Sequence, residues 1–249
     1  LYTYQLQNRK LSPLDTKRNG LPHNTIYSII RTGDIQIYVG TYNGLCRYIA
    51  SNGKFEKIPL PVNSSQSNLF VNSLLEDTGR QCIWIGTEGY LFQYFPSTGQ
   101  MKQTEAFHNN SIKSLALDGN GDLLAGTDNG LYVYHNDVTP LQHIIHDSRN
   151  IQSLTNNIIW NIFADQEHNI WLGTDYGISL SRYNSALQFI PISQITGTGD
   201  GNQFYSLFRD SKGFYWFGGT NGLIRFTDPA GDKHNAIWYS CLLYTSDAA

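Results

Sequence analysis

The chain has 249 residues and a formal net charge of −3, from 17 Lys and Arg against 20 Asp and Glu. A balance this close to neutral provides no basic stripe for nucleic acid, and no run approaches the roughly 18 apolar residues of a membrane span. Charged residues make up only 15% of the chain while aromatic residues reach 13%, which favours short strands and tight turns over helices.

A glycine-containing phrase recurs five times along the chain. It reads IYVGTYNGLCRY at 37–48, IWIGTEGYLFQY at 83–94, LLAGTDNGLYVY at 123–134, IWLGTDYGISLSRY at 170–183 and YWFGGTNGLIRF at 215–226. The first glycines of these phrases are 46, 40, 47 and 45 residues apart: Gly40, Gly86, Gly126, Gly173 and Gly218. Self-similarity at a nearly fixed period indicates a repeat architecture.

An apolar phrase precedes each of these glycines at a nearly constant distance. It reads TIYSII from Thr25 and FYSLFRD from Phe204, and the period-two alternation of such a run predicts a strand. Its Ser or Asn lies 12 or 13 residues before the glycine: Ser28, Ser73, Ser114, Asn161 and Ser206. Turn residues such as Asp118-Gly-Asn-Gly121 connect the two phrases, which predicts a hairpin.

Each repeat contains four short apolar runs, because a further run follows each glycine phrase. Four strands in about 40–45 residues form one blade of a β-propeller. We expect an all-β fold, namely a partial β-propeller of about five four-stranded blades that forms an open arc of a seven-bladed parent. The expected segments are a blade remnant at 1–19, blades at about 20–62, 63–108, 109–151 and 152–198, and an incomplete blade at 199–240.

The last nine residues, CLLYTSDAA at 241–249, share no pattern with the repeats. A translated sequencing adapter reads the same, residue for residue. We therefore expect this tail not to be native and to pack on nothing, and we expect the chain to be a fragment of a longer gene.

Residues that recur in the repeats are interpreted as structural. An Asp at the first hairpin turn is expected to cap that turn, and a Trp in the glycine phrase is expected to pack between blades. These residues are Asp77, Asp118, Asp165 and Asp210, and Trp84, Trp171 and Trp216. The Asn that precedes the first strand in four repeats is interpreted as a turn former, with a polar ring around the channel mouth as the alternative: Asn24, Asn110, Asn157 and Asn202.

Positions that break the repeat are the better candidates for ligand binding. In a propeller, the start of the first strand and the turn between the second and third strands lie on one face, and aromatic rings there can stack on sugar faces. Burial under a neighbouring loop is the alternative explanation for these rings. The candidates on the first strand are Tyr27, Asn72, Lys113, Trp160 and Tyr205. The candidates at the turn tips are Tyr42, Glu88, Asp128, Asp175, Tyr176 and Asn221.

The sequence favours neither a metal site nor a catalytic site. His143 and His146 are three residues apart, which on a strand places their side chains on opposite faces. Cys46 and Cys82 lie in neighbouring repeats without a second motif. We therefore expect no metal, no cofactor and no catalytic residue in this segment.

The phrases resemble the two-component regulator propeller repeat, whose pattern is roughly N-x-I-x-S-I-x-x-D-x-x-G-x-I-W-I-G-T-x-x-G-L-x-x-Y. The segment SLTNNIIWNIFADQEHNIWLGTDYGI at 153–178 follows this pattern best, and the resemblance extends from residue 1 to about 226. The departures are mild: Thr32 replaces the Asp, Leu124-Ala125 replace Trp-Ile, and Gly89-Tyr90 shift the turn.

The resemblance implies the periplasmic sensor region of a hybrid sensor histidine kinase of the inner membrane, a type common in gut bacteria that degrade polysaccharides. It implies an oligosaccharide ligand, a homodimer of the full-length protein, and a signal passed through the rest of the parent chain to a histidine kinase. Two alternatives stay open, because a fold alone does not determine function. One is a propeller-fold enzyme, such as a lyase or a glycosidase, and the other is a protein–protein scaffold.

Overall fold

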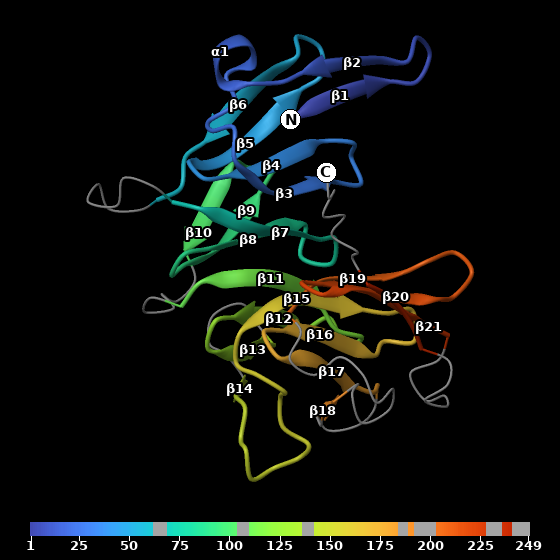
Figure 1. The fold of residues 1–249 in the computed structure, drawn as a ribbon. Coiled ribbons are helices and arrows are strands. Elements are labelled where there is room, and N and C mark those ends of the chain that lie inside the picture. Colours follow the sequence, from blue (N-terminus) through green and yellow to red (C-terminus); the bar gives the residue numbers. More distant parts are fainter. Residues whose placement is uncertain are drawn as a thin grey trace, which may run out of the picture. The chain divides into compact units, whose positions relative to one another are not determined.

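Short strands joined by tight turns build nearly all of this computed structural model (Figure 1). It describes residues 1–61, 69–103, 110–135, 142–183, 189–191, 203–227 and 236–240. The tail at 241–249 and Asn202 lie outside these described residues. The chain divides into two compact units, a first unit of residues 1–115 and a second unit formed by most of residues 116–249.

The first unit begins with a hairpin of β1 (Tyr2–Gln5) and β2 (Lys10–Pro13), followed by the short helix α1 (Thr16–Asn19). Two four-stranded antiparallel sheets follow. The strands of the earlier sheet are β3 (Ile26–Arg31), β4 (Ile37–Thr41), β5 (Gly44–Ile49) and β6 (Lys54–Ile58). The strands of the later sheet are β7 (Val71–Asp77), β8 (Cys82–Thr87), β9 (Leu91–Phe95) and β10 (Gln100–Gln103).

Three further four-stranded sheets follow in chain order, and the division between the units falls within β11. The strands of the first of them are β11 (Ile112–Leu117), β12 (Leu123–Thr127), β13 (Gly130–Tyr134) and β14 (Gln142–Ile144). The strands of the next are β15 (Ile159–Ala164), β16 (Ile170–Thr174), β17 (Gly177–Ser181) and β18 (Phe189–Pro191). The strands of the last are β19 (Phe204–Arg209), β20 (Tyr215–Gly219), β21 (Gly222–Phe226) and β22 (Ile237–Ser240).

The predicted all-β fold of consecutive four-stranded antiparallel blades, a partial propeller, is confirmed. The first glycine occupies an equivalent place in four of the five sheets. It lies opposite the Ser or Asn of the preceding strand in the pairs Ser28–Gly40, Ser73–Gly86, Asn161–Gly173 and Ser206–Gly218.

Gly40 and Gly173 show why the repeat requires glycine at this place. A Cβ atom on Gly40 would lie 2.6 Å from the backbone oxygen of Val71, and a Cβ atom on Gly173 would lie 2.6 Å from the backbone oxygen of Phe204. Val71 and Phe204 each begin the first strand of the following sheet. Glycine therefore allows the first strand of one sheet to approach the backbone of the sheet before it.

The core lies between neighbouring sheets within each unit. In the first unit, Leu45, Val71 and Ile85 are fully buried in one cluster. In the second unit, the fully buried Trp171 has its ring centroid 4.7 Å from that of Tyr215, in the following sheet. The predicted packing of this Trp between blades is thereby confirmed.

Trp216 differs from Trp171, because it is partly exposed. It stacks on Tyr239 of its own sheet, with 5.9 Å between ring centroids. In the described part of the chain, no sheet follows β19–β22 to cover this face.

The recurring aspartates cap their turns, as predicted. Oδ1 of Asp77 accepts a hydrogen bond from the Arg80 amide at 2.9 Å, and Oδ1 of Asp165 accepts one from the Asn169 amide at 2.8 Å. A second bond was not predicted from the sequence. In both residues Oδ2 accepts from the indole N–H of the recurring Trp, at 3.0 Å from Trp84 and 2.9 Å from Trp171.

This Asp–Trp bond cannot form in two of the sheets, where the repeat departs from its pattern. In the β3–β6 sheet, Thr32 stands at the Asp position and Tyr38 at the Trp position. In the β11–β14 sheet, the Asp remains as Asp118 but Leu124 stands at the Trp position.

Candidate functional site

Four of the first strands contain a β-bulge near their start. The ladder between β3 and β4 skips one residue between Ile26 and Ser28, and the same shift recurs in β7, β15 and β19. The skipped residues are Tyr27, Asn72, Trp160 and Tyr205. Because a bulged residue is unpaired and its side chain is re-aimed, these positions can change from repeat to repeat without altering the ladder.

The turn tips meet the starts of the first strands, as predicted for one end of each sheet. The Tyr42 amide donates to the Thr25 carbonyl at 3.1 Å, and the Asp175 amide donates to the Ile158 carbonyl at 3.0 Å. We call this end of each sheet, which also carries the bulge, the bulge end. It is the place where the variable side chains of the repeats gather.

An aromatic group covers the bulge end in the first unit. The ring centroid of Tyr42 lies 4.2 Å from that of Phe70 and 4.8 Å from that of His23, and Tyr27 lies 6.3 Å from Phe70. Tyr27 is 47% exposed. The group therefore presents aromatic surface that a ligand could cover.

A short polar chain lies at the bulge end of the next sheet in the same unit. Asn72 Nδ2 donates to Ser111 Oγ at 3.0 Å, and Ser111 Oγ donates to Glu88 Oε1 at 3.2 Å. Lys113, the remaining candidate of this unit, is half-buried on β11. These bonds fix the orientation of the Asn72 amide and of one Glu88 oxygen.

The second unit contains the densest group of candidates, which we call the Trp160 patch: Trp160, Asp175, Gln203 and Tyr205. Trp160 Nε1 and Gln203 Nε2 both donate to Asp175 Oδ1, at 3.1 and 2.6 Å. The Tyr205 hydroxyl donates to Gln203 Oε1, and the Tyr205 and Trp160 rings meet edge to face at 5.1 Å. The patch combines two partly exposed rings with an ordered row of polar groups.

The predicted residues are thus divided between the units. The first unit holds Tyr27, Tyr42, Asn72, Glu88 and Lys113, and the second holds Asp128, Trp160, Asp175, Tyr176, Tyr205 and Asn221. Within the second unit, Trp160, Asp175 and Tyr205 come together. Tyr176 is 53% exposed beside Asp175, while Asp128 and Asn221 lie at the tips of other sheets.

Three site residues were missed by the sequence analysis: Phe70, Ser111 and Gln203. Each stands two residues before a first-strand candidate, directly before the strand. A usable signal existed, because this position also changes in every repeat and reads Thr25, Phe70, Ser111, Ile158 and Gln203. The same criterion of broken symmetry would have found it.

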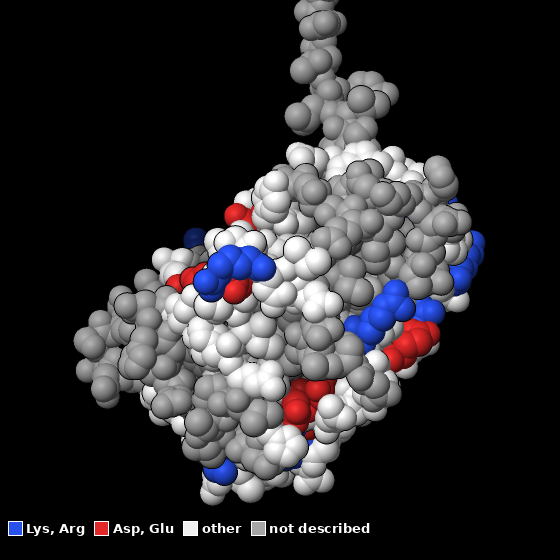
Figure 2. All heavy atoms as spheres, turned by 90° about the horizontal axis from the view of Figure 1, so that it is seen from below, with Lys and Arg blue, Asp and Glu red and all other residues white. Residues whose placement is uncertain are grey.

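Other kinds of site find little support in the described part of the chain. No group of three or more His, Cys, Asp or Glu there is placed to hold a metal ion. No described helix is both long and apolar enough to cross a membrane. On the face drawn in Figure 2, described basic and acidic side chains lie interspersed, so they form no basic stripe on that face.

Comparison with known proteins supports the interpretation of the repeat as a propeller repeat. The two-component regulator propeller family matches residues 153–176 and 198–221. Two solved structures of the extracellular domain of BT4673 from B. thetaiotaomicron are 91% and 92% identical to this chain, each with a TM-score of 0.71. One assigns that protein to the one-component systems and the other to the hybrid two-component systems. The match covers 96% of this chain and 32% of BT4673, so the chain spans about a third of that relative.

A more distant structure shares the fold alone. Virginiamycin B lyase from Staphylococcus aureus is 13% identical, with a TM-score of 0.65 over 93% of this chain and 74% of the lyase. The comparison with curated proteins found no match.

Proposed function

Because this chain belongs to the two-component regulator propeller repeat family, we propose that it is a ligand-sensing segment of a hybrid two-component regulator. In this proposal the segment lies outside the cytoplasm, in the periplasm, and binds an oligosaccharide. The rest of the parent chain then passes the signal to a histidine kinase, and the full-length protein works as a homodimer. The high identity to an extracellular domain of such a system supports the location.

The Trp160 patch is the observation that carries the proposed ligand class. The faces of sugar rings are weakly apolar and are surrounded by hydroxyl groups, so they are bound by aromatic rings with polar groups beside them. Trp160 and Tyr205 provide the rings, and Asp175 and Gln203 provide the polar groups. Since the bonds among these four residues already exist, little side-chain ordering has to accompany binding.

The geometry supports binding in preference to catalysis. Asp175 already accepts two hydrogen bonds from neighbouring side chains, and His23 Nδ1 accepts from the Thr25 amide at 3.0 Å. Burial raises the pKa of the Cys46 thiol to about 12, so it would not act as a thiolate nucleophile. We therefore propose no enzymatic activity for this segment.

Titration calorimetry against a panel of oligosaccharides tests this function. We expect at least one of them to bind, and we expect Trp160→Ala to weaken that binding by about 1–3 kcal/mol, the loss typical of an aromatic hot spot. Trp238→Ala is the matched control, because Trp238 is 36% exposed on β22 and outside the patch. Unchanged affinity in Trp160→Ala, or an equal loss in Trp238→Ala, would remove the patch from the site.

A further inference from the structure

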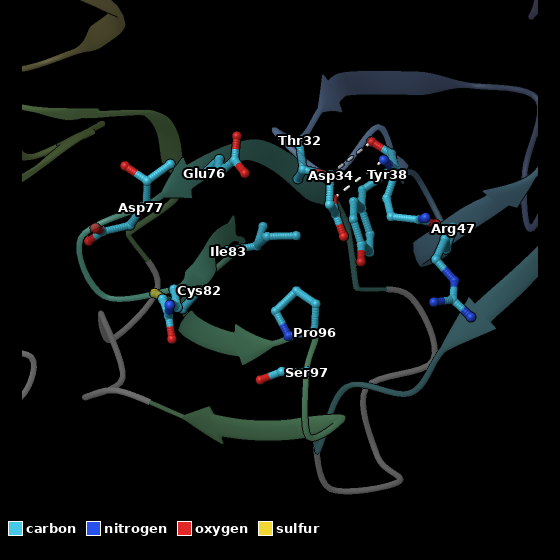
Figure 3. A pocket seen from close by; sticks show the side chains of 13 residues that line it. Thr32, Asp34, Tyr38, Arg47, Glu76, Asp77, Cys82, Ile83, Pro96 and Ser97 are labelled. Atoms are coloured by element: carbon cyan, nitrogen blue, oxygen red, sulfur yellow. Dashed lines mark hydrogen bonds between the residues drawn. The ribbon is translucent and has the colours of Figure 1, made fainter.

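A cavity lies at the end of the first unit's sheets opposite the bulge end. It has a volume of about 480 Å³ and is lined by the turn after β3, the end of β7 and the turn after β9 (Figure 3). The cavity lies beyond the pair Arg31–Ile37, at the end of β3. The bulge end lies at the start of β3, at the pair Ile26–Thr41. The cavity is therefore distinct from the candidates described above.

The repeat is broken at this cavity. Thr32 and Tyr38 replace the Asp and Trp that elsewhere bond to each other, and both residues line the opening. Tyr38 is only 1% exposed, and the Arg47 guanidinium lies beside its hydroxyl without forming a hydrogen bond of normal geometry with it. In Figure 3 this hydroxyl points into the space between Asp34, Ile83 and Pro96. A buried hydroxyl without a well-formed hydrogen bond costs free energy, so a bound ligand that supplies this bond would be stabilised here.

The second unit shows what the same place holds elsewhere. Glu167 is equivalent to Asp34, because each lies two residues after the Asp position of its repeat. Arg209 is equivalent to Glu76, because each directly precedes the Asp of the following repeat. Arg209 Nη1 reaches across from its own sheet to both carboxylate oxygens of Glu167, at 2.8 and 2.6 Å. In the first unit, the position of that arginine is occupied by a second carboxylate.

The cavity consequently holds negative charge that no described side chain neutralises with an ion pair. Neither Asp34 nor Glu76 forms an ion pair within the described residues. The cationic side chains nearby are already engaged, because Arg47 pairs with Glu56 at 2.6 Å and Arg80 pairs with Asp77 at 2.8 Å. From the described residues, Glu76 accepts the Gly33 amide alone, at 2.9 and 3.1 Å to its two oxygens.

We propose that this cavity binds a guanidinium group on a short carbon stem, which takes the place that Arg209 occupies in the second unit. The planar cation donates to Asp34 and Glu76 and to the lone pair of the Tyr38 hydroxyl, while Ile83 and Pro96 contact the stem. A metal ion is disfavoured, since the described residues contain no cluster of three or more metal-ligating side chains. The guanidinium is carried either by a free small molecule or by an arginine side chain of a peptide.

An NMR titration that follows the Gly33 amide tests the proposal. We expect saturable binding of n-propylguanidinium and affinity at least about tenfold weaker for N-propylurea, its neutral isostere, since a charge-assisted bond is lost. Binding of Nα-acetyl-arginine methylamide would identify a peptide as a usable source, and its failure to bind would restrict the ligand to free cations. Equal binding of the urea, or binding of calcium in place of the guanidinium, would overturn the proposal.

Variants separate the charge from the fold. Asp34→Asn should weaken n-propylguanidinium binding at least about tenfold. Asp147→Asn makes the same change in an exposed loop of the second unit and should not weaken it. Tyr38→Phe should weaken binding without lowering the melting temperature, because the hydroxyl that it removes forms no hydrogen bond of normal geometry within the described residues. Glu76→Arg should restore the internal pair, abolish binding and raise the melting temperature. Unchanged binding in Asp34→Asn and Glu76→Arg would contradict the proposal.

Discussion

At the scale of single residues, the bond between the turn aspartate and the tryptophan keeps the aspartate ionised and links the turn to the following strand. The carboxylate of Asp77 is buried, which by itself raises its pKa, but the Trp84 indole and the Arg80 donors outweigh burial and hold the pKa below its ordinary value of 3.8. The Trp216 indole likewise lowers the pKa of Asp210. The aspartate thus stays ionised while it ties the turn to the following strand.

Asp77→Asn should therefore lower the free energy of unfolding by about 2 kcal/mol near neutral pH, because the bonds to Trp84 and Arg80 lose their charge. The pKa of Asp77 is lower in the folded than in the unfolded protein, so its contribution is complete above the unfolded value. It is lost as the pH falls through the folded value. Denaturant unfolding between pH 7 and pH 2 should show this acid-dependent loss in the wild type and a smaller one in the variant.

Asp118→Asn provides the control for that measurement. Asp118 caps its turn through the Asp122 amide at 2.8 Å, but Leu124 stands where the tryptophan would be. Since Asn can also cap a turn, this variant should change stability by less than about 0.5 kcal/mol. A loss as large as that of Asp77→Asn would assign the effect to the turn instead of the indole bond.

At the scale of the elements, the first strands β7, β15 and β19 each serve two purposes. Their apolar residues, such as Val71, pack against the glycine of the preceding sheet, while the bulged residue beside them points away from the ladder. One strand can therefore contain both a closely packed residue and a variable residue, because the bulge directs their side chains to different surroundings.

Gly40→Ala should lower the free energy of unfolding by about 3 kcal/mol, because the added methyl group overpacks the contact between the sheets. The new Cβ would lie 2.4 Å from Ser28 Oγ and 2.6 Å from the Val71 backbone. Gly33→Ala is the matched control, since the nearest atom to its Cβ would be at an ordinary 3.7 Å. Thermal unfolding of both variants decides this, and equal melting temperatures would show that β7 shifts freely.

The strands of this fold could be predicted from the sequence, but the bulges could not. Alternation and turn residues identify β3 or β19 locally, because they depend on neighbours in the chain. A bulge depends on the register between two strands, so the sequence could show that Tyr27 and Trp160 vary without showing that they are unpaired. The hydrogen bond from Trp84 to Asp77 was missed for a related reason, since both residues were recognised as recurring but each was interpreted separately.

At the scale of the whole molecule, the β19–β22 sheet has a partly exposed apolar face that no described sheet covers. Phe208 is 59% exposed there, and Trp216 is partly exposed although Trp84 and Trp171, at the same position in their sheets, are fully buried. Apolar surface of this kind indicates a contact that is made in the complete protein. We expect a further sheet to pack on this face, and the blade bounds given above remain a prediction.

Hydroxyl-radical footprinting tests this expectation. In the 249-residue chain, Trp216 should be oxidised readily while Trp171 is protected. In a chain extended by the next repeats of the parent, Trp216 should become protected and Trp171 should not change. Oxidation of Trp216 at the same rate in both chains would show that no sheet covers it.

The bulges have a consequence for how new specificities arise. Residues 27, 72, 160 and 205 contribute no pairing to their ladders. If they bind the ligand as proposed, a mutation at one of them should alter recognition with little loss of folding stability. Selection can then sample all twenty amino acids at several independent points on an unchanged scaffold. A combinatorial library randomised at these four codons should consequently contain mostly folded members, and it offers a direct way to evolve binders from this chain.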